Sequence, residues 1–399
     1  MLRTRSPRKE KISNCYLHSN SLSNKMDNSL LAVRDINHKY IVVERRRCSL
    51  KFIHIADVHL GVMPDQGKPW SEQRARQIWD SFADVIGVAK REKPEFLFVT
   101  GDLFHAQPLK KEVREVSRLF GEIPDTQVLL IAGNHDYLRE KSYYLADLWP
   151  DNVTVFKKEE AEAVDFPEYN TTVYGLSYWH REIRDRLYDD LHPVNHSRCN
   201  ILLAHGGDER HIPFSAERIL QNGFDYIAAG HIHRSGWLMP HKAVMAGSLE
   251  PTDCNDTGPH GYWMGTFGAA GADVYFYPLR HCEYCHEMYQ ADRNTTDRML
   301  WDWAKELLEQ RPEYQYFRLY IKGKKDPEYS FDVQEIGKLD RIVDITDQTV
   351  PDYDYEKLLE EHADSILGEY IRSMRKKEPG VCTAKALEYG VNALLGYDC

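Results

Sequence analysis

Short apolar runs and amphipathic stretches alternate along the chain from residue 50 onward. The runs LKFIHIA, EFLFVT and QVLLIAG each give way to polar or glycine residues, which is typical of buried strands. Residues 71–91, between the first two runs, carry apolar side chains at helical spacing, and residues 113–120 repeat that spacing before the third run. Strand, helix, strand, helix, strand predicts a largely parallel sheet covered by helices.

The apolar runs that follow have few helical stretches between them. They read NILLAH, DYIAAG, AVMAG, GYWMGTF and ADVYFYPL. We expect these runs to form a second, mixed sheet that packs on the first. The predicted fold class is therefore α/β, with two mixed β-sheets packed as a sandwich and flanked by helices.

The pattern changes near residue 281. TTDRMLWDWAKELLEQ predicts an amphipathic helix, and YQYFRLYIKG and RIVDI predict strands, which together indicate a small α/β capping domain. Residues 355–374 predict one helix, and AKALEYGVNALL predicts another after a Pro-Gly break. We therefore divide the chain into an N-terminal extension (1–48), a main domain (49–281), a capping domain (282–350) and C-terminal helices (351–399).

Length and composition fit a globular chain. A chain of 399 residues suggests two domains with appendages, at roughly 150 residues per domain. No apolar run approaches the ~18 residues that span a bilayer, and the eight cysteines follow no disulfide-like spacing, so we expect a cytoplasmic protein. Cys282 and Cys285 would need His281, His286 or distant cysteines to bind zinc, and a strand end or turn that happens to hold two cysteines is the favoured alternative.

Charge is distributed unevenly. Residues 1–50 hold 11 Lys/Arg and 4 Asp/Glu, a net of +7, whereas the remaining residues have a net of −18. The first 25 residues are polar and aperiodic, which predicts disorder in the basic extension. We favour Met26 as the true start, with a nucleic-acid-binding arm or an organelle transit peptide as the alternatives.

Polar residues follow the apolar runs in a fixed order: D-x-H, GD, GNHD, H and GHxH. Asp57 and His59, two positions apart on the first strand, should point to one face. An open α/β sheet places its ligand site at the carboxyl ends of its strands, so we expect all these residues to converge. The candidate metal ligands are Asp57, His59, Asp102, Asn134, His205, His231 and His233.

Seven nitrogen and oxygen ligands without a thiolate favour two octahedral divalent ions such as Mn²⁺. Asp102 is the expected bridge, and the two ions would activate a bridging hydroxide that attacks a phosphodiester. His135 is left without a metal, so we expect it to be the general acid, with Asp136 holding its other ring nitrogen. A merely structural His-Asp pair is the alternative.

The motifs ADVHLG, GDLFH, AGNHD, AGHIH and AGSLEPTDCNDTGPHGYW resemble the calcineurin-like metallophosphoesterase superfamily. Within it they resemble the SbcD-type DNA repair nucleases and their YhaO-like branch. The resemblance implies that one metal lies among Asp57, His59, Asp102 and His233, and the other among Asp102, Asn134, His205 and His231.

The same resemblance implies further roles. His135 takes the catalytic-histidine position, and His105 matches a second histidine near the DNA end. The capping domain would help shape the DNA groove, and the last helices would dock on the coiled coil of an SMC-like ATPase partner. A homodimer through the nuclease domain is also implied.

Two basic runs are candidate DNA contacts, with solvated faces as the alternative. They comprise Lys322, Lys324 and Lys325 in IKGKK, and Arg372, Arg375, Lys376 and Lys377 in RSMRKK. The leading hypothesis is a metal-dependent DNA nuclease that works with an ATPase. The alternatives are a small-molecule phosphodiesterase or phosphatase, and a DNA-end tether whose metal site is idle.

Overall fold

The computed structural model describes residues 30–34, 40–44, 50–196, 198–268 and 271–396. The chain divides into two compact units, Met1–Arg47 and Cys48–Cys399. In the first unit, β1 (Leu30–Arg34) pairs antiparallel with β2 (Tyr40–Glu44). Part of the extension that we expected to be disordered therefore forms strands, because LLAVR and YIVVE are largely apolar and YIVVE is rich in β-branched residues. The prediction of disorder in the first 25 residues falls outside the described residues.

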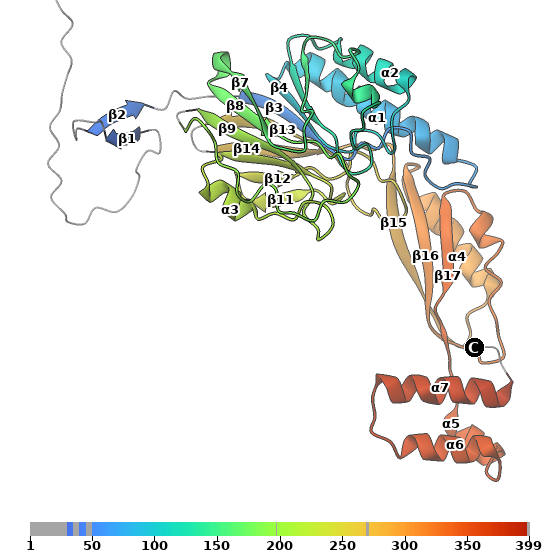
Figure 1. The fold of residues 1–399 in the computed structure, drawn as a ribbon. Helices are drawn as coiled ribbons and strands as arrows, with labels where there is room; N and C mark the ends of the chain where they lie inside the picture. Colours follow the sequence, from blue (N-terminus) through green and yellow to red (C-terminus); the bar gives the residue numbers. More distant parts are fainter. Residues whose placement is uncertain (1–29, 35–39, 45–49, 197, 269–270, 397–399) are drawn as a thin grey trace, which may run out of the picture. The chain divides into compact units, whose positions relative to one another are not determined.

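The first sheet of the larger unit has the strand order β14-β13-β3-β4-β5-β6. Its strands β3, β4, β13 and β14 are labelled in Figure 1. Its strands are β3 (Leu50–Ile55), β4 (Phe96–Thr100), β5 (Gln127–Ile131), β6 (Val153–Val155), β13 (Gly261–Gly268) and β14 (Gly271–Pro278). β3, β4 and β5 are parallel, as predicted, β6 adds a fourth parallel strand that was not predicted, and β13 adds antiparallel to β3. We had assigned β13 and β14 to the second sheet. That assignment was wrong, since the pairing of Trp263 with His54 places β13 on the free edge of β3.

Helices cover the outer face of this sheet. They are α1 (Ser71–Glu92), α2 (Lys110–Phe120) and the short 3₁₀ helix η1 (Tyr143–Leu145). Ile78 and Phe82 of α1 and Val113 of α2 are buried in one cluster with Ile53 and Ile55 of β3. The helical stripes read from the sequence are thus the faces that pack on the sheet.

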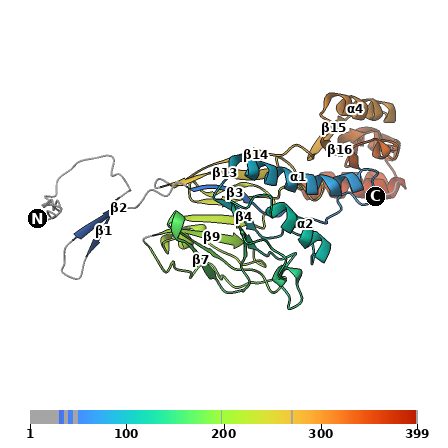
Figure 2. The ribbon, with the colours of Figure 1, turned by 90° about the horizontal axis from the view of Figure 1, so that it is seen from above.

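The second sheet has the order β11-β12-β10-β9-β8-β7 and lies against the first (Figure 2). Its elements are β7 (Glu162–Phe166), β8 (Thr171–Gly175), β9 (Cys199–His205), β10 (Tyr226–Gly230), β11 (Gly236–Met239), β12 (Ala243–Met245), the short 3₁₀ helix η2 (Pro167–Tyr169) and α3 (Ala216–Gln221). Phe52, Phe96 and Phe98 of the first sheet meet Ile201 and Leu203 of the second in a fully buried layer. The sandwich predicted from the apolar runs is therefore present.

A third sheet follows along the chain. It contains β15 (Glu283–Ala291), β16 (Gln315–Lys325), β17 (Ile342–Asp347) and β18 (Val350–Pro351), with α4 (Asp297–Gln310) and the short 3₁₀ helix η3 (Ile336–Lys338). β15 and β16 are parallel and are connected through α4. Leu300 and Ala304 of α4 are buried with Phe317 and Leu319 of β16. We call residues 282–351 the cap.

The chain continues into α5 (Tyr355–Glu361), α6 (Ile366–Arg375) and α7 (Val381–Leu395), which share a small apolar cluster. The single helix expected over residues 355–374 is two helices. Ser365 caps α6 by accepting a hydrogen bond from Gly368 N. A new helix therefore begins at a point where the apolar periodicity had predicted one uninterrupted helix. Among the described residues, no helix has the length and apolar character that a membrane crossing requires.

Candidate metal centre

Four of the seven expected ligands have left-handed backbone conformations. Their φ angles are 49° at Asp57, 52° at His59, 50° at Asp102 and 99° at His231. Such angles are uncommon for residues with a Cβ atom, and a cluster of them often marks a functional site. Our placement of Asp57 and His59 on a strand was wrong, because β3 ends at Ile55.

Backbone hydrogen bonds hold these strained turns together. Asp57 N donates to Gly101 O at 3.1 Å, and His59 N donates to Asp102 O at 3.0 Å. The loop after β3 is therefore paired with the loop after β4, although neither loop continues as a regular strand. This pairing, and not strand alternation, brings the two pairs of side chains together.

The first group of ligand atoms belongs to Asp57, His59 and His233, which lie within 4.8 Å of one another. The Nε2 atoms of His59 and His233 are 3.1 Å apart. Two nitrogens on one divalent ion, each bonded at about 2.1 Å and at right angles, would be about 3.0 Å apart. Asp57 Oδ2 accepts from His231 N, while its buried Oδ1 has no hydrogen-bond partner among the described residues. An unpaired buried carboxylate oxygen beside two facing imidazoles fits a bound cation.

The second group comprises Asp102, His205 and His231, also within 4.8 Å of one another. Asn134 Oδ1 lies 3.0 Å from both His205 Nε2 and His231 Nδ1. The Nδ1–H of His205 donates to Thr100 O at 2.9 Å, which leaves Nε2 as the lone-pair nitrogen that faces the group. These four side chains offer three kinds of ligand to a second cation.

Asp102 lies between the two groups. Its Oδ2 is 3.4 Å from His205 Nε2 and 4.0 Å from His59 Nε2, and its Oδ1 accepts from His135 N at 2.8 Å. Burial opposes ionisation of this carboxyl, but the adjacent His205 ring holds the pKa of Asp102 well below its ordinary value. The charged form suits an oxygen that serves two cations at once.

All seven predicted ligands thus converge on one buried edge of the sandwich. The donor set contains carboxylate, amide and imidazole groups, and no cysteine joins any potential metal-binding group among the described residues. This set fits two hard or borderline divalent cations better than a structural zinc ion. Cys282, which we considered as a possible zinc ligand, is a buried core residue, and burial raises the pKa of its thiol.

Two further carboxylates, which the sequence reasoning missed, hold the outer nitrogens of the ligand histidines. Asp208 Oδ2 is 2.8 Å from His231 Nε2, and Asp256 Oδ2 is 2.9 Å from His233 Nδ1. A carboxylate in this position fixes the tautomer and the orientation of a metal-bound imidazole. Both aspartates lie in loops rich in polar residues, GGDERH and TDCNDTG, where nothing in the local pattern distinguishes them from solvated loop residues.

His105 and His135 lie beside the first group. The ring centroids of His59 and His135 are 4.8 Å apart, and those of His105 and His135 are 5.2 Å apart. The Nδ1–H of His135 donates to the backbone O of His105 at 3.1 Å, so Nε2 is free to exchange a proton with a ligand.

Asp136 does not hold His135, contrary to our expectation. Its oxygens accept from Gly133 N at 2.8 Å, from Phe104 N at 3.0 Å and from the Tyr144 hydroxyl. Burial raises the pKa of Asp136 to about 7. This side chain is fully buried, and its bonds to Gly133 N and Phe104 N tie the turn that presents Asn134 and His135 to the loop after β4.

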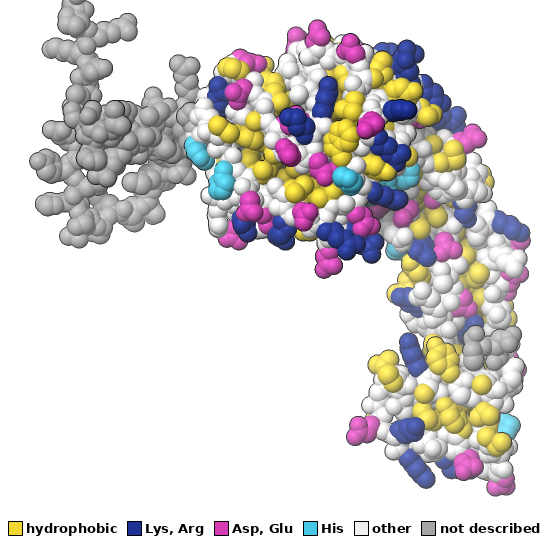
Figure 3. All heavy atoms as spheres, viewed as in Figure 1, with side chains coloured by type: hydrophobic (Ala, Val, Ile, Leu, Met, Phe, Trp, Pro, Cys, Tyr) yellow, Lys and Arg dark blue, Asp and Glu magenta, His cyan; other side chains and the backbone are white. Residues whose placement is uncertain are grey.

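The candidate DNA contacts lie on the cap and on α6. Lys324 pairs with Asp352 at 2.9 Å, Lys325 with Asp347 at 2.8 Å and Arg375 with Glu356 at 2.7 Å. Lys322 lies over the Tyr320 ring, and Arg372 donates to Ala363 O. On the face drawn in Figure 3, Lys and Arg side chains alternate with Asp and Glu side chains on residues 50–396. Neighbouring carboxylates therefore offset part of the positive charge of the lysines and arginines that we named as candidate DNA contacts.

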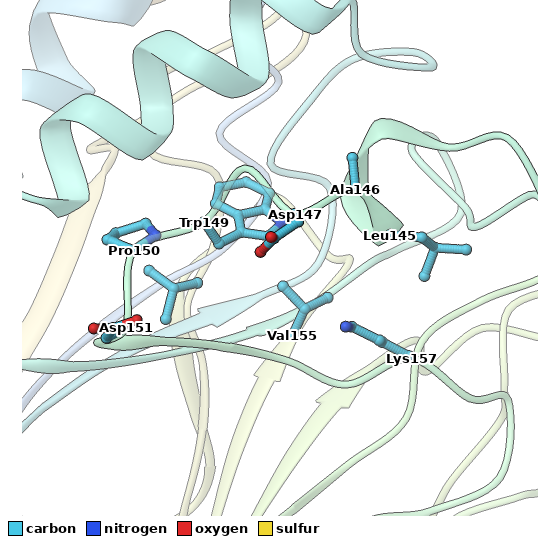
Figure 4. Close-up of a pocket in the computed structure, with 9 residues that line it drawn as sticks. Leu145, Ala146, Asp147, Trp149, Pro150, Asp151, Val155 and Lys157 are labelled. Carbon is cyan, nitrogen blue, oxygen red and sulfur yellow. The ribbon is translucent and has the colours of Figure 1, made fainter.

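A hollow of about 280 Å³ lies at the edge strand β6 (Figure 4). Leu145, Trp149 and Val155 line it together with Asp147, Asp151 and Lys157. No predicted ligand is among its lining residues, so this hollow is separate from the metal centre.

The model of the calcineurin-like phosphoesterase family matches residues 50–235. The uncharacterized metallophosphoesterase YhaO of Bacillus subtilis is 28% identical over 234 residues, which is 54% of this chain and 57% of YhaO. The DNA double-strand break repair protein Mre11 of Methanocaldococcus jannaschii is 29% identical over 196 residues, 46% of this chain and 52% of that protein. Mre11 of Methanococcus maripaludis is 27% identical over 202 residues, with the same two coverages.

The chain thus spans about half the length of the curated relatives it matches. Among solved structures, a dimetal phosphatase from Danio rerio aligns with a TM-score of 0.35 and 15% identity, over 57% of this chain and 99% of that chain. The family match covers the strands and loops that carry all seven predicted ligands. Residues 50–235 of this chain are therefore a calcineurin-like metallophosphoesterase domain, with homology to YhaO and the Mre11 proteins.

Proposed function

We propose that this phosphoesterase is a metal-dependent nuclease that hydrolyses phosphodiester bonds at DNA ends. The observation that carries the proposal is the pair of ligand groups that share Asp102, with His135 directly beside them. Such a pair suits in-line displacement at phosphorus, and the neighbouring histidine suits a leaving group that needs a proton.

The charge of the site suits a phosphodiester. Two divalent cations held by only two ligand carboxylates, Asp57 and Asp102, keep a positive surplus, and the neutral Asn134 preserves it. A phosphodiester carries one negative charge, so it is attracted without having to displace a ligand. The Asp208 and Asp256 carboxylates lie behind the histidines and moderate this surplus.

When bound, the cations lower the pKa of water to provide a nucleophile and offset the charge that gathers on the phosphoryl oxygens. The chain supplies the remaining parts. His135 holds a proton on Nε2 for the leaving oxygen, and its Nδ1–H bond to His105 O fixes the direction of the ring. Its backbone N–H donates to Asp102 Oδ1, which couples the acid to the shared ligand.

We favour Mn²⁺ as the cation, because imidazole, amide and carboxylate ligands without thiolate suit it. DNA as substrate is supported by the name of the two archaeal relatives, which are DNA double-strand break repair proteins. From the resemblance of the motifs to the SbcD-type nucleases, we also propose that an SMC-like ATPase subunit and a second copy of this chain are its partners. The small-molecule phosphodiesterase is the second candidate, since the ligand groups described above would serve it equally well.

The test uses the full chain with Mn²⁺, end-labelled linear duplex DNA and, separately, bis(p-nitrophenyl) phosphate. We expect DNA degradation that the His135→Asn variant loses. The matched control is His180→Asn, since His180 is an exposed histidine paired with Glu159 and should retain full activity. Turnover of the small ester alone would favour the second candidate. If the DNA stays intact both without and with the ATPase subunit, the proposal is contradicted.

A further inference from the structure

The loop between β12 and β13 holds Asp256 unusually firmly. Asp256 Oδ2 accepts from Thr252 N at 3.0 Å, from Thr252 Oγ1 at 2.8 Å and from the Nδ1–H of His233 at 2.9 Å. Its backbone O accepts from His260 Nε2 at 3.1 Å. Three donors converge on one carboxylate oxygen, so the orientation of the His233 ring depends on where this loop lies.

The cap contacts this same loop on either side of Asp256. His286 Nε2 on β15 donates to Cys254 O at 2.8 Å, and Arg318 Nη1 on β16 donates to Asn255 Oδ1 at 3.1 Å. Thr257 forms an isolated parallel bridge with Tyr284, also on β15. Residues 254, 255 and 257 are therefore all held by cap strands, and residue 256 between them holds a metal ligand.

We propose that Asp256 is a positioning residue for His233 and that the cap, through β15 and β16, sets the affinity of the Asp57, His59 and His233 group for its cation. An imidazole that donates Nδ1–H to a carboxylate directs its Nε2 lone pair at the metal and is a better ligand for it. A shift of the cap would move the 254–257 backbone and turn His233 away from His59. The inference rests on the metal-dependent part of the proposed function, and it holds whatever the substrate is.

The second group provides an internal comparison. Asp208 holds His231, but its other partners are Arg210 N, His211 N and His211 Nδ1, all within its own loop. Nothing in this set of contacts belongs to the cap. A change in the cap should therefore weaken one of the two cation sites and leave the other unchanged.

The experiment is calorimetric titration of the metal-free full chain with Mn²⁺, without substrate. His233→Ala first identifies which of the two binding steps belongs to the Asp57, His59 and His233 group. We expect the near-isosteric Asp256→Asn to weaken that step by about 10- to 100-fold and to leave the other step unchanged. Arg318→Ala, which removes a cap contact and touches no ligand, should weaken the same step by a smaller factor.

The matched control is Arg298→Ala, since Arg298 is an exposed cap residue that pairs with Asp302 on α4. It should bind both cations as the original chain does. Circular dichroism in chelator should show the same folded signal for all variants, so a lost binding step cannot be ascribed to unfolding.

Wild-type binding of both cations by Asp256→Asn would overturn the positioning role. Weakened binding by Asp256→Asn together with unchanged binding by Arg318→Ala and by an Asn255→Ala variant would overturn the role of the cap. Failure of the nuclease proposal is distinguishable, because it would appear as intact DNA with a chain that still binds two cations.

Discussion

The two ligand groups of the centre use the same chemistry but are supported differently. In each, a histidine that follows β10 contributes one ring nitrogen to the group and gives the other to an aspartate. Asp208 is 44% exposed as a side chain and lies in a loop that is held by its own residues and by Ile183, which belongs to the main domain and not to the cap. Asp256 is 19% exposed and lies in a loop held by the cap. One half of this centre is therefore supported within the main domain, and the other half is supported by contacts from the cap.

The largest expected effect comes from removing what the two groups share. Asp102→Asn should weaken both Mn²⁺ binding steps by at least about 100-fold. Loss of a carboxylate that only supports a ligand costs about 10- to 100-fold in metal affinity, and this substitution removes a charged ligand itself. Phosphodiester hydrolysis should fall with it. Calorimetry and a hydrolysis assay check this, with Asp80→Asn, an exposed aspartate on α1, as the control. Loss of only one binding step would show that Asp102 is not shared.

The next largest effect should come from Gly101→Ala, which alters the backbone beside the second group, that of Asp102, His205 and His231. Gly101 has a φ of +90°, and a Cβ atom there would lie 2.2 Å from His205 Nδ1. Gly101→Ala should displace His205 from Thr100 O, abolish the binding step of the second group and lower the free energy of unfolding by about 1–3 kcal/mol or more through backbone strain.

Gly236→Ala is the control for this substitution, because nothing lies within 4 Å of the added atom. Denaturant unfolding and calorimetric titration measure the two effects. A Gly101→Ala variant that binds both cations normally would show that the His205 ring can move without cost to the centre.

The comparison is sharpened by the counterpart of Asp256. Asp208→Asn should weaken the second group's binding step by about 10- to 100-fold, because the His231 ring loses the charged acceptor that orients it. In a double variant with Arg318→Ala, the effects of the two substitutions on cation binding should add, because each substitution acts on a different ligand group. Titration of the single and double variants checks this, and a strongly non-additive result would contradict the independence of the two halves.

The smallest effect at neutral pH concerns the scaffold beneath both groups. His54 is fully buried, its Nε2–H donates to Thr100 Oγ1 at 2.9 Å, and burial lowers its pKa to about 3. Because the unfolded chain binds a proton near pH 6.5 and the folded chain does not, stability is lost as pH falls below 6.5. Between pH 7 and pH 5 the loss from this residue is about 2 kcal/mol.

His54→Gln removes this titration, so the variant should lose about 2 kcal/mol less than the original chain over that interval. Urea denaturation in chelator at pH 7 and pH 5 provides the measurement. Equal pH dependence of the two proteins would show that His54 is not the buried neutral histidine described here.

The sequence indicated which side chains come together because the signal is local and repeated. Each of the five motifs follows an apolar run, and parallel strands bring their carboxyl ends to one edge, so the grouping of the seven candidate ligands could be predicted, while their binding of metal stays a prediction. The helical stripes on α1 and α2 were found for the same reason. The hydrogen-bond partners of Asp136 could not be predicted in this way. Its side chain could turn toward His135 or toward the core, and the packing of Tyr144 determines that it turns toward the core.

The sequence by itself therefore determined which residues form the sandwich core and which seven side chains meet at its edge, because both follow from periodicity and from the order of strand ends. Only the tertiary structure decided that β13 joins β3, that Asp57 and His59 lie in left-handed turns held by the loop after β4, and that Asp256 and Asp208 stand behind the ligand histidines. These features depend on contacts between segments that are far apart in the chain. No local pattern encodes such contacts, because each is selected by the packing of both partners at once.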